Sequence, residues 1–104
     1  MPHHLKLFSG IERQLRKFPN KDRERVVEAM RSLATDPRQP GTTHLSENLY
    51  RFRVGNYRII YAIFDAGLVV LICKVARRTE TTYKDIKALL KRARDMNLNS
   101  RGHS

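Results

Sequence analysis

The stretch LYRFRVGNYRIIY, residues 49–61, decides the expected fold, because apolar and polar residues alternate on both sides of a Gly-Asn pair. Alternation with a period of two is typical of a β-strand with one buried face. A two-residue connection such as Gly55-Asn56 suits a type I′ or type II′ turn. The stretch therefore predicts a β-hairpin in which Arg53 faces Arg58 across the two strands.

The predicted hairpin separates its side chains by chemistry. One face carries the residues that suit a platform for packed helices: Tyr50, Phe52, Val54, Tyr57, Ile59 and Tyr61. The other face carries Arg51, Arg53 and Arg58. Like charges that face each other across two strands destabilise the pair by up to about 1 kcal/mol. Because guanidinium groups stay charged and offer a planar fork of donors, we interpret the cluster as a phosphate site.

Two other interpretations of the arginine cluster stay open. Nearby acids could neutralise it, and Glu47 and Asp65 are the candidates in this part of the chain. Alternatively, a register shift of one residue would separate Arg53 from Arg58. We favour the phosphate site, because few acids lie close in sequence and because local stability rules tend to be broken where function requires it.

The remaining elements follow from the spacing of apolar residues and from turn signals. In chain order they are a short strand at 5–8, helices at 10–18 and 21–35, a polar loop at 36–48, a buried strand at 68–75 and a helix capped by Thr82. Ser9 and Glu12 have the spacing of a capping box for the first helix. We predict an α+β fold, with an N-terminal helical hairpin packed on a small antiparallel, mixed-edge sheet of about four strands, and a C-terminal helix. Residues 1–95 form the single domain, and residues 96–104 form a polar tail that we expect to be frayed.

The composition restricts the class of protein. The chain has 104 residues, which fits one small domain, and no apolar run approaches the ~20 residues that span a membrane. The N-terminus lacks the features of a secretory signal, and the single Cys73 lies in an apolar run. We therefore expect a cytoplasmic protein with a buried thiol. The sequence holds no zinc-ligand spacing and no glycine-rich phosphate loop, so we expect neither a metal nor a cofactor.

The charge of the chain indicates its partners. There are 21 lysines and arginines against 10 acidic residues, which gives a net charge of +11. Such a surplus favours encounter with polyanions. At this size it favours a nucleic-acid or ribonucleoprotein partner. An acidic protein partner is the competing interpretation, and the two can coexist.

The segment KVARRTETTY, residues 74–83, adds cations and a tyrosine near the hairpin. Pairing the last two strands through a short turn places Val75 near Arg58, so the following segment can reach the arginine cluster. The added cations are Lys74, Arg77 and Arg78. Tyr83 could stack on a base or take part in proton transfer, and it could equally pack the last helix against the sheet.

These residues resemble the RelE/ParE superfamily of bacterial toxins from toxin–antitoxin modules. The resemblance is carried by LYRFRVGNYRIIYAI, by the apolar strand after it and by KVARRTETTY, and it covers about residues 5–90. It implies a RelE-like fold. RelE-like members are endoribonucleases that cleave mRNA in the ribosomal A site, whereas ParE-like members share the fold and poison DNA gyrase.

In RelE-like members, basic residues on the central strands, an arginine after the last long strand and a following tyrosine serve cleavage. By motif, these roles fall on Arg51, Arg53, Arg58, Arg78 and Tyr83. The chain departs from many relatives, which have lysines in place of Arg51 and Arg53 and a Gly-His pair in place of Ala76-Arg77. An arginine does not readily give up its proton, so neither Arg51 nor Arg53 can act as a general base.

The resemblance implies a reaction without metal, in which the 2′-hydroxyl of the RNA attacks the scissile phosphorus. On this hypothesis Arg53 and Arg58 hold the scissile phosphate, and Arg51 holds a neighbouring one. Arg78 stabilises the leaving 5′-oxygen, and Tyr83 orients or deprotonates the 2′-hydroxyl.

Further residues have supporting roles in this hypothesis. Lys74 and Arg77 bind RNA beside the reacting phosphate. His44 ionises near neutral pH and is a spare acid–base candidate, although it also fits an ordinary solvated loop residue. The apolar stripe of the last predicted helix either packs on the sheet or acts as a lid that a partner displaces; its residues are Ile86, Leu89, Leu90 and Ala93.

The implied partners are a cognate acidic antitoxin, the ribosome and mRNA, with no membrane and no small-molecule cofactor. Two alternatives remain. The first is a ParE-like gyrase inhibitor without nuclease chemistry. The second is a catalytically degenerate toxin-fold protein that only binds its partners, which would not be toxic on expression.

Overall fold

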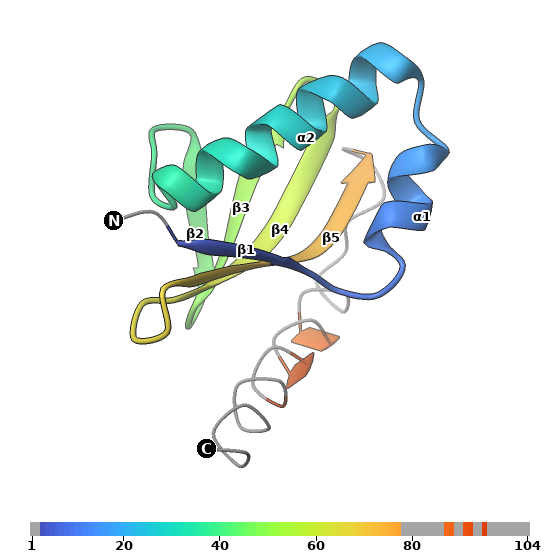
Figure 1. The fold of residues 1–104 in the computed structure, drawn as a ribbon. Coiled ribbons are helices and arrows are strands. Elements are labelled where there is room, and N and C mark those ends of the chain that lie inside the picture. Colours follow the sequence, from blue (N-terminus) through green and yellow to red (C-terminus); the bar gives the residue numbers. More distant parts are fainter. Residues whose placement is uncertain (1–2, 78–86, 89–90, 93–94, 96–104) are drawn as a thin grey trace.

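The computed structural model describes residues 3–77, 87–88, 91–92 and 95, and it shows a five-stranded mixed sheet with two helices (Figure 1). The elements in chain order are β1 (His4–Leu7), α1 (Ile11–Arg16), α2 (Asn20–Thr35), β2 (Thr42–Ser46), β3 (Leu49–Val54), β4 (Tyr57–Phe64) and β5 (Val69–Arg77). The strand order is β1-β5-β4-β3-β2. The predicted α+β class is confirmed.

The centre of the sheet is the predicted antiparallel meander of β3, β4 and β5. β1 pairs with β5 in parallel, which makes this edge of the sheet mixed, as expected. A parallel pair needs a long crossover, and the chain between β1 and β5 includes both helices. The helices are thereby brought over the sheet.

β2 is a strand that the sequence analysis did not predict, because residues 36–48 were assigned to a loop. It pairs antiparallel with β3, with Thr42 opposite Phe52 and a bulge between His44 and Ser46. Threonine favours strands, but an edge strand of polar residues lacks the alternation that reveals a buried face. The sheet therefore has five strands, and the expectation of about four is corrected.

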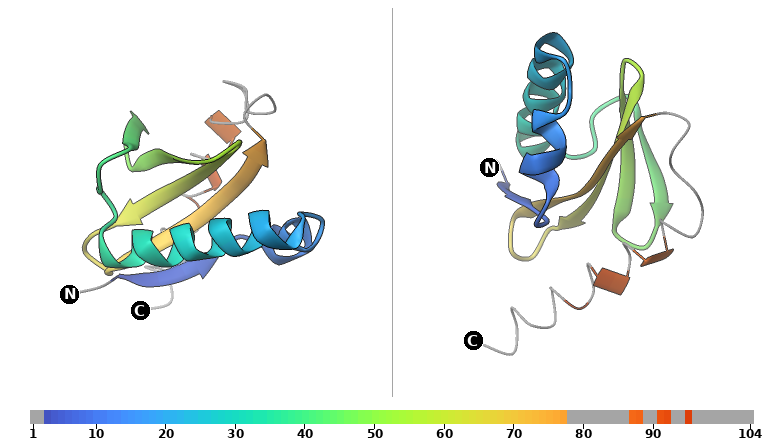
Figure 2. Two further views of the ribbon diagram at one scale, coloured as in Figure 1. Left: turned by 90° about the horizontal axis from the view of Figure 1, so that it is seen from above. Right: turned by 90° about the vertical axis from the view of Figure 1, so that its right-hand side faces the viewer.

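Both helices lie on one face of the sheet, as the edge-on view in Figure 2 shows. α1 contacts β5, and α2 contacts β1, β5 and β3. α1 begins after Gly10, whose φ is 92°, and no side chain caps it, so the predicted Ser9 cap is wrong. Antiparallel packing of the two helices against each other stays a prediction.

The main core lies between the helices and the sheet. Val26 and Leu33 from α2 and Tyr61 from β4 are completely buried. The Tyr61 hydroxyl donates a 2.6 Å hydrogen bond to the backbone oxygen of Pro37, which satisfies a buried polar group. Cys73 is buried and unpaired, as predicted, and burial raises the pKa of its thiol to about 12.

The predicted C-terminal helix and the tail at residues 96–104 fall largely outside the described residues. Within the described part of the chain, no helix is long and apolar enough to cross a membrane.

Candidate functional site

The hairpin register is the predicted one, and Arg53 faces Arg58. Gly55 has a φ of 57°, whereas Asn56 does not have a positive φ. A positive φ at the first turn residue alone is the pattern of a type II′ turn, which matches the twist of the flanking strands. Arg51 lies two residues before Arg53 on the same face of β3. The alternative of a shifted register is therefore excluded.

The pairing of β4 with β5 differs from the prediction. A bulge interrupts the register between Ile60 and Tyr61, so Ala76 rather than Val75 faces Arg58. An extra residue on one strand moves every side chain beyond it to the opposite face. The bulge therefore decides which cations of β5 share a face with the hairpin arginines.

Lys74 pairs with Ile60 and lies on the face that carries the arginines. Arg77 pairs with Tyr57 and belongs to the opposite, helix-covered face. The structure thus brings together four cations from three adjacent strands, which we call the arginine face: Arg51, Arg53, Arg58 and Lys74.

Lys6 on β1 also lies on the arginine face, and the sequence analysis missed it. It is exposed and pairs with Leu71, which in turn pairs with Ala62 on the face of Arg58. The neighbours Leu5 and Leu7 pack against the core, so alternation in this strand was the available signal.

Two guanidinium groups on the arginine face have unsatisfied donors. The Nε atoms of Arg51 and Arg58 are buried, and neither has a hydrogen-bond partner in the part of the chain that the structure describes. An unpaired buried donor costs about 1–3 kcal/mol, and more for a charged group. An anion bound on this face would satisfy these donors. The two unpartnered Nε atoms therefore indicate an anion-binding site.

The positive charges of the arginine face repel one another, and burial together with this repulsion changes the pKa of Arg51. Burial, together with the positive charges of Arg58 and Arg53, lowers the pKa of Arg51 below its usual range. Among the described residues, no acidic side chain contributes to this shift. A bound polyanion would relieve the repulsion.

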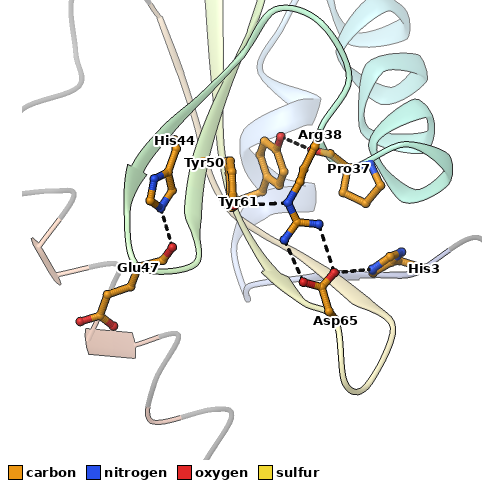
Figure 3. A network of polar contacts seen from close by, with 8 residues as sticks. All are labelled: His3, Pro37, Arg38, His44, Glu47, Tyr50, Tyr61 and Asp65. Atoms are coloured by element: carbon orange, nitrogen blue, oxygen red, sulfur yellow. Dashed lines mark hydrogen bonds and ion pairs between the residues drawn. The ribbon is translucent and has the colours of Figure 1, made fainter.

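Asp65 does not neutralise the arginine face, although the sequence allowed it. Its carboxylate accepts two hydrogen bonds from Arg38, at 2.8 and 3.2 Å, and lies 3.4 Å from the ring of His3 (Figure 3). The Arg38 hydrogen bonds hold the pKa of Asp65 below its usual range. Figure 3 also shows the Glu47 side chain directed away from this network.

His44 lies on the face of the sheet opposite the arginines. It pairs with Tyr50 across β2 and β3, and the two rings are 4.9 Å apart between centroids. Its Nε2 lies 2.6 Å from the backbone oxygen of Glu47 (Figure 3). In this position it does not face a phosphate held by Arg53 or Arg58.

Two of the predicted catalytic residues, Arg78 and Tyr83, lie outside the described residues, so their roles stay predictions. Among the residues that the structure describes, no group of three or more His, Cys, Asp or Glu could hold a metal ion. The chemistry available on the arginine face is the binding of anions and the stabilisation of developing negative charge.

Known proteins share this fold. Residues 5–82 match the family described as the ParE toxin of the type II toxin–antitoxin system, parDE. The RelBE2 toxin–antitoxin complex of Mycobacterium tuberculosis has 28% sequence identity and a TM-score of 0.65, and the match covers 75% of this chain and 100% of that chain. The archaeal RelE–RelB complex from Pyrococcus horikoshii OT3 has 26% identity and a TM-score of 0.69, with 78% and 100% covered.

A free mutant of the Escherichia coli toxin RelE shows the same fold at 19% identity, with a TM-score of 0.71 and 88% and 98% of the two chains covered. A comparison with the curated proteins gave no match. The fold defines a toxin of the RelE/ParE superfamily. Within that superfamily, the chain belongs to the ParE toxin family of type II toxin–antitoxin systems.

Proposed function

We propose that this toxin is an endoribonuclease that cleaves mRNA in the ribosomal A site. The observation that carries the proposal is the pair of buried, unpartnered Nε donors of Arg51 and Arg58, beside the exposed Arg53. Donors of this kind fit phosphate oxygens. The similarity to RelE toxins at 26–28% identity supports the same conclusion.

The proposed reaction is attack by the 2′-hydroxyl on the adjacent phosphorus. The new bond joins the 2′-oxygen to phosphorus, and the bond to the 5′-oxygen breaks, which leaves a 2′,3′-cyclic phosphate and a 5′-hydroxyl. Arg53 and Arg58 hold the scissile phosphate and stabilise its added negative charge, which can supply several kcal/mol. Arg51 and Lys74 hold neighbouring phosphates, whereas Arg77, predicted to bind RNA beside them, lies on the opposite face of the sheet and is left out of this assignment.

The proton transfers are assigned to the segment after β5. Tyr83 orients the 2′-hydroxyl or takes its proton, which requires a phenol with a pKa lowered by surrounding cations. Arg78 stabilises the leaving 5′-oxygen, which takes a proton from water to become the 5′-hydroxyl. A tyrosine is a weak base, so we propose that the ribosome supplies much of the orientation of the message.

We also propose an acidic antitoxin as the partner of this toxin. The similar structures from M. tuberculosis and P. horikoshii are both toxin–antitoxin complexes. A chain with a net charge of +11 attracts an acidic protein at long range, in competition with RNA.

The test is a reconstituted translation reaction with an end-labelled message, with and without ribosomes, mapped by primer extension. We expect cuts inside codons only on translating ribosomes. Arg58→Ala and Arg78→Ala should keep the fold and reduce cleavage at least about a hundredfold, because each removes a donor to the reacting phosphate. Arg31→Ala is the matched control, because it removes one exposed charge from α2 and should cleave normally. Full activity in both Arg58→Ala and Arg78→Ala would contradict the assignment.

Gyrase inhibition is the second candidate, and the match to the ParE family favours it. The arginines at positions 51 and 53, where many RelE-like relatives have lysines, also fit a binding surface. An intact message from a protein that still stops growth would point to this function, and a gyrase supercoiling assay would then test it. A protein that is not toxic at all would indicate the degenerate alternative.

A further inference from the structure

The tip of the β3–β4 hairpin, residues 53–58, carries the facing arginines. Its β4 side pairs with β5, where Ala76 lies opposite Arg58 and Arg77 lies opposite Tyr57. β2 accompanies β3 only as far as Phe52, which pairs with Thr42. Facing guanidiniums repel each other. Among the described strands, only β4 pairs with the β3 side of the tip, so an attachment outside the sheet would help Arg53 and Arg58 to keep one geometry.

α2 provides this attachment through Tyr57. The Tyr57 hydroxyl donates a 2.8 Å hydrogen bond to Oδ2 of Asp22, in the first turn of α2. The Tyr57 ring is 7% exposed and packs on Phe18, with centroids 4.5 Å apart. Arg25, one helical turn after Asp22, lies over the turn, because a Cβ atom at Gly55 would be 3.4 Å from its Nη1.

Dense packing does not hold the rest of the hairpin to the helix. A cavity of about 70 Å³ lies between them, lined by Asp22, Arg25, Val54, Gly55, Asn56 and Tyr57. Further along α2, an open groove of about 730 Å³ is lined by the helix and by Phe52 and Val54 of β3. Where apolar contact is sparse, a directional hydrogen bond has a large influence on the position of the hairpin tip relative to α2.

We propose that Asp22 and Tyr57 are positioning residues for the arginine pair. Their hydrogen bond holds the backbone at Tyr57, and therefore Arg58 beside it and Arg53 opposite, at a spacing that suits one phosphate. Tyr57 lies on the helix-covered face and touches no substrate, so it acts only through the strand. The activity part of this inference rests on the proposed function.

The first test compares two buried tyrosines of the same strand. Tyr57→Phe removes the hydroxyl that binds Asp22. Tyr61→Phe, four residues further along β4, removes the hydroxyl that binds the backbone of Pro37. We expect Tyr57→Phe to lower the cleavage rate on ribosomes about tenfold to a hundredfold with unchanged ribosome affinity, since a small misplacement has effects of this size. Tyr61→Phe should cleave at the wild-type rate below its melting temperature.

A second pair of variants separates positioning from general stability. Asp22→Ala removes the acceptor, whereas Asp22→Asn keeps an amide oxygen that can accept from Tyr57. We expect Asp22→Asn to recover most of the cleavage rate that Asp22→Ala loses. Equal loss in both variants would show that the carboxylate charge, and not the hydrogen bond, is what matters, and would overturn the inference.

Amide hydrogen exchange tests the inference without a substrate. Exchange at residues 53–58 should be faster in Tyr57→Phe and unchanged in Tyr61→Phe. Faster exchange with a normal cleavage rate, or equal loss of activity in the two variants, would overturn the inference. If the wild type cuts no message, the proposed function fails by itself, and unchanged exchange in Tyr57→Phe would then separately overturn the inference.

Discussion

The facing pair of Arg53 and Arg58 contradicts the usual chemistry of a strand pair at the scale of single residues. Like charges opposite each other are destabilising, and the Nε of Arg58 is also buried without a partner. Asp65 is engaged by Arg38 elsewhere. A phosphate would compensate the repulsion and the unpaired donor together, which is a physical reason for arginines at these positions.

The first prediction concerns the cost of this pair. Arg53→Leu should raise the stability of the free protein by up to about 1 kcal/mol, because it removes the repulsion from Arg58 at an exposed position. For a domain of this size, that corresponds to up to roughly 4–8 °C in melting temperature. Thermal unfolding followed by circular dichroism measures the change.

Arg53→Lys is the matched control, because it keeps the charge and should leave the melting temperature near that of the wild type. A clear decrease in the melting temperature of Arg53→Leu would mean that Arg53 supports the fold. The interpretation of the pair as a binding feature would then lose its energetic argument.

At the scale of secondary-structure elements, the bulge in β5 determines which of its cations lie on the arginine face. One extra residue on this strand places Lys74 with the arginines and Arg77 with Tyr57. Without the bulge, the alternation of β5 would exchange these two faces. The composition of the arginine face is therefore a property of how two strands pair and is not visible in either strand alone.

The second prediction concerns the turn that joins β3 to β4. Gly55→Ala should destabilise the protein by about 1 kcal/mol, because φ at this position is 57° and the added Cβ would lie 3.4 Å from Arg25. Gly67→Ala, in the β4–β5 turn, is the control, because its Cβ would meet only Val69 at 3.8 Å and its φ is not strained. Urea unfolding of both variants measures the difference, and equal midpoints would contradict the strain argument.

Buried protonated groups limit the stability of the whole molecule at high pH. Burial raises the pKa of Tyr61 above the usual tyrosine range, and a hydrogen bond to Asp22 together with burial raises the pKa of Tyr57. The pKa of each tyrosine is higher in the folded than in the unfolded state. Their contribution to the free energy of unfolding is therefore fully present at a pH below about 10, the pKa of an unfolded tyrosine. It is lost as the pH rises through the folded value.

The third prediction follows from these shifts. The free energy of unfolding should fall as the pH rises above about 10, the pKa of an unfolded tyrosine, by up to about 1.4 kcal/mol per pH unit for each group. Tyr61→Phe should show a smaller slope than the wild type, because it removes one of these protons. Urea unfolding at several pH values measures the slopes, and equal slopes would show that Tyr61 does not contribute.

Much of this protein could be predicted from the sequence because the decisive signals are local. Alternation and the Gly55-Asn56 turn determined the hairpin, its register and the common face of Arg51, Arg53 and Arg58. Apolar spacing located both helices and the buried strand of Cys73. Each of these features depends on how apolar residues are spaced within one short segment, and that spacing can be read from the sequence alone.

The tertiary structure decided what depends on pairing between segments. β2 exists because β3 offers an edge, and its polar residues carry no pattern of their own. The bulge in β5, which moved Ala76 opposite Arg58, is a local irregularity that no periodicity predicts. The hydrogen bond from Tyr57 to Asp22 joins residues far apart in the chain. Contacts of this kind arise only when helix and sheet pack together, because that packing brings the two groups within reach of each other.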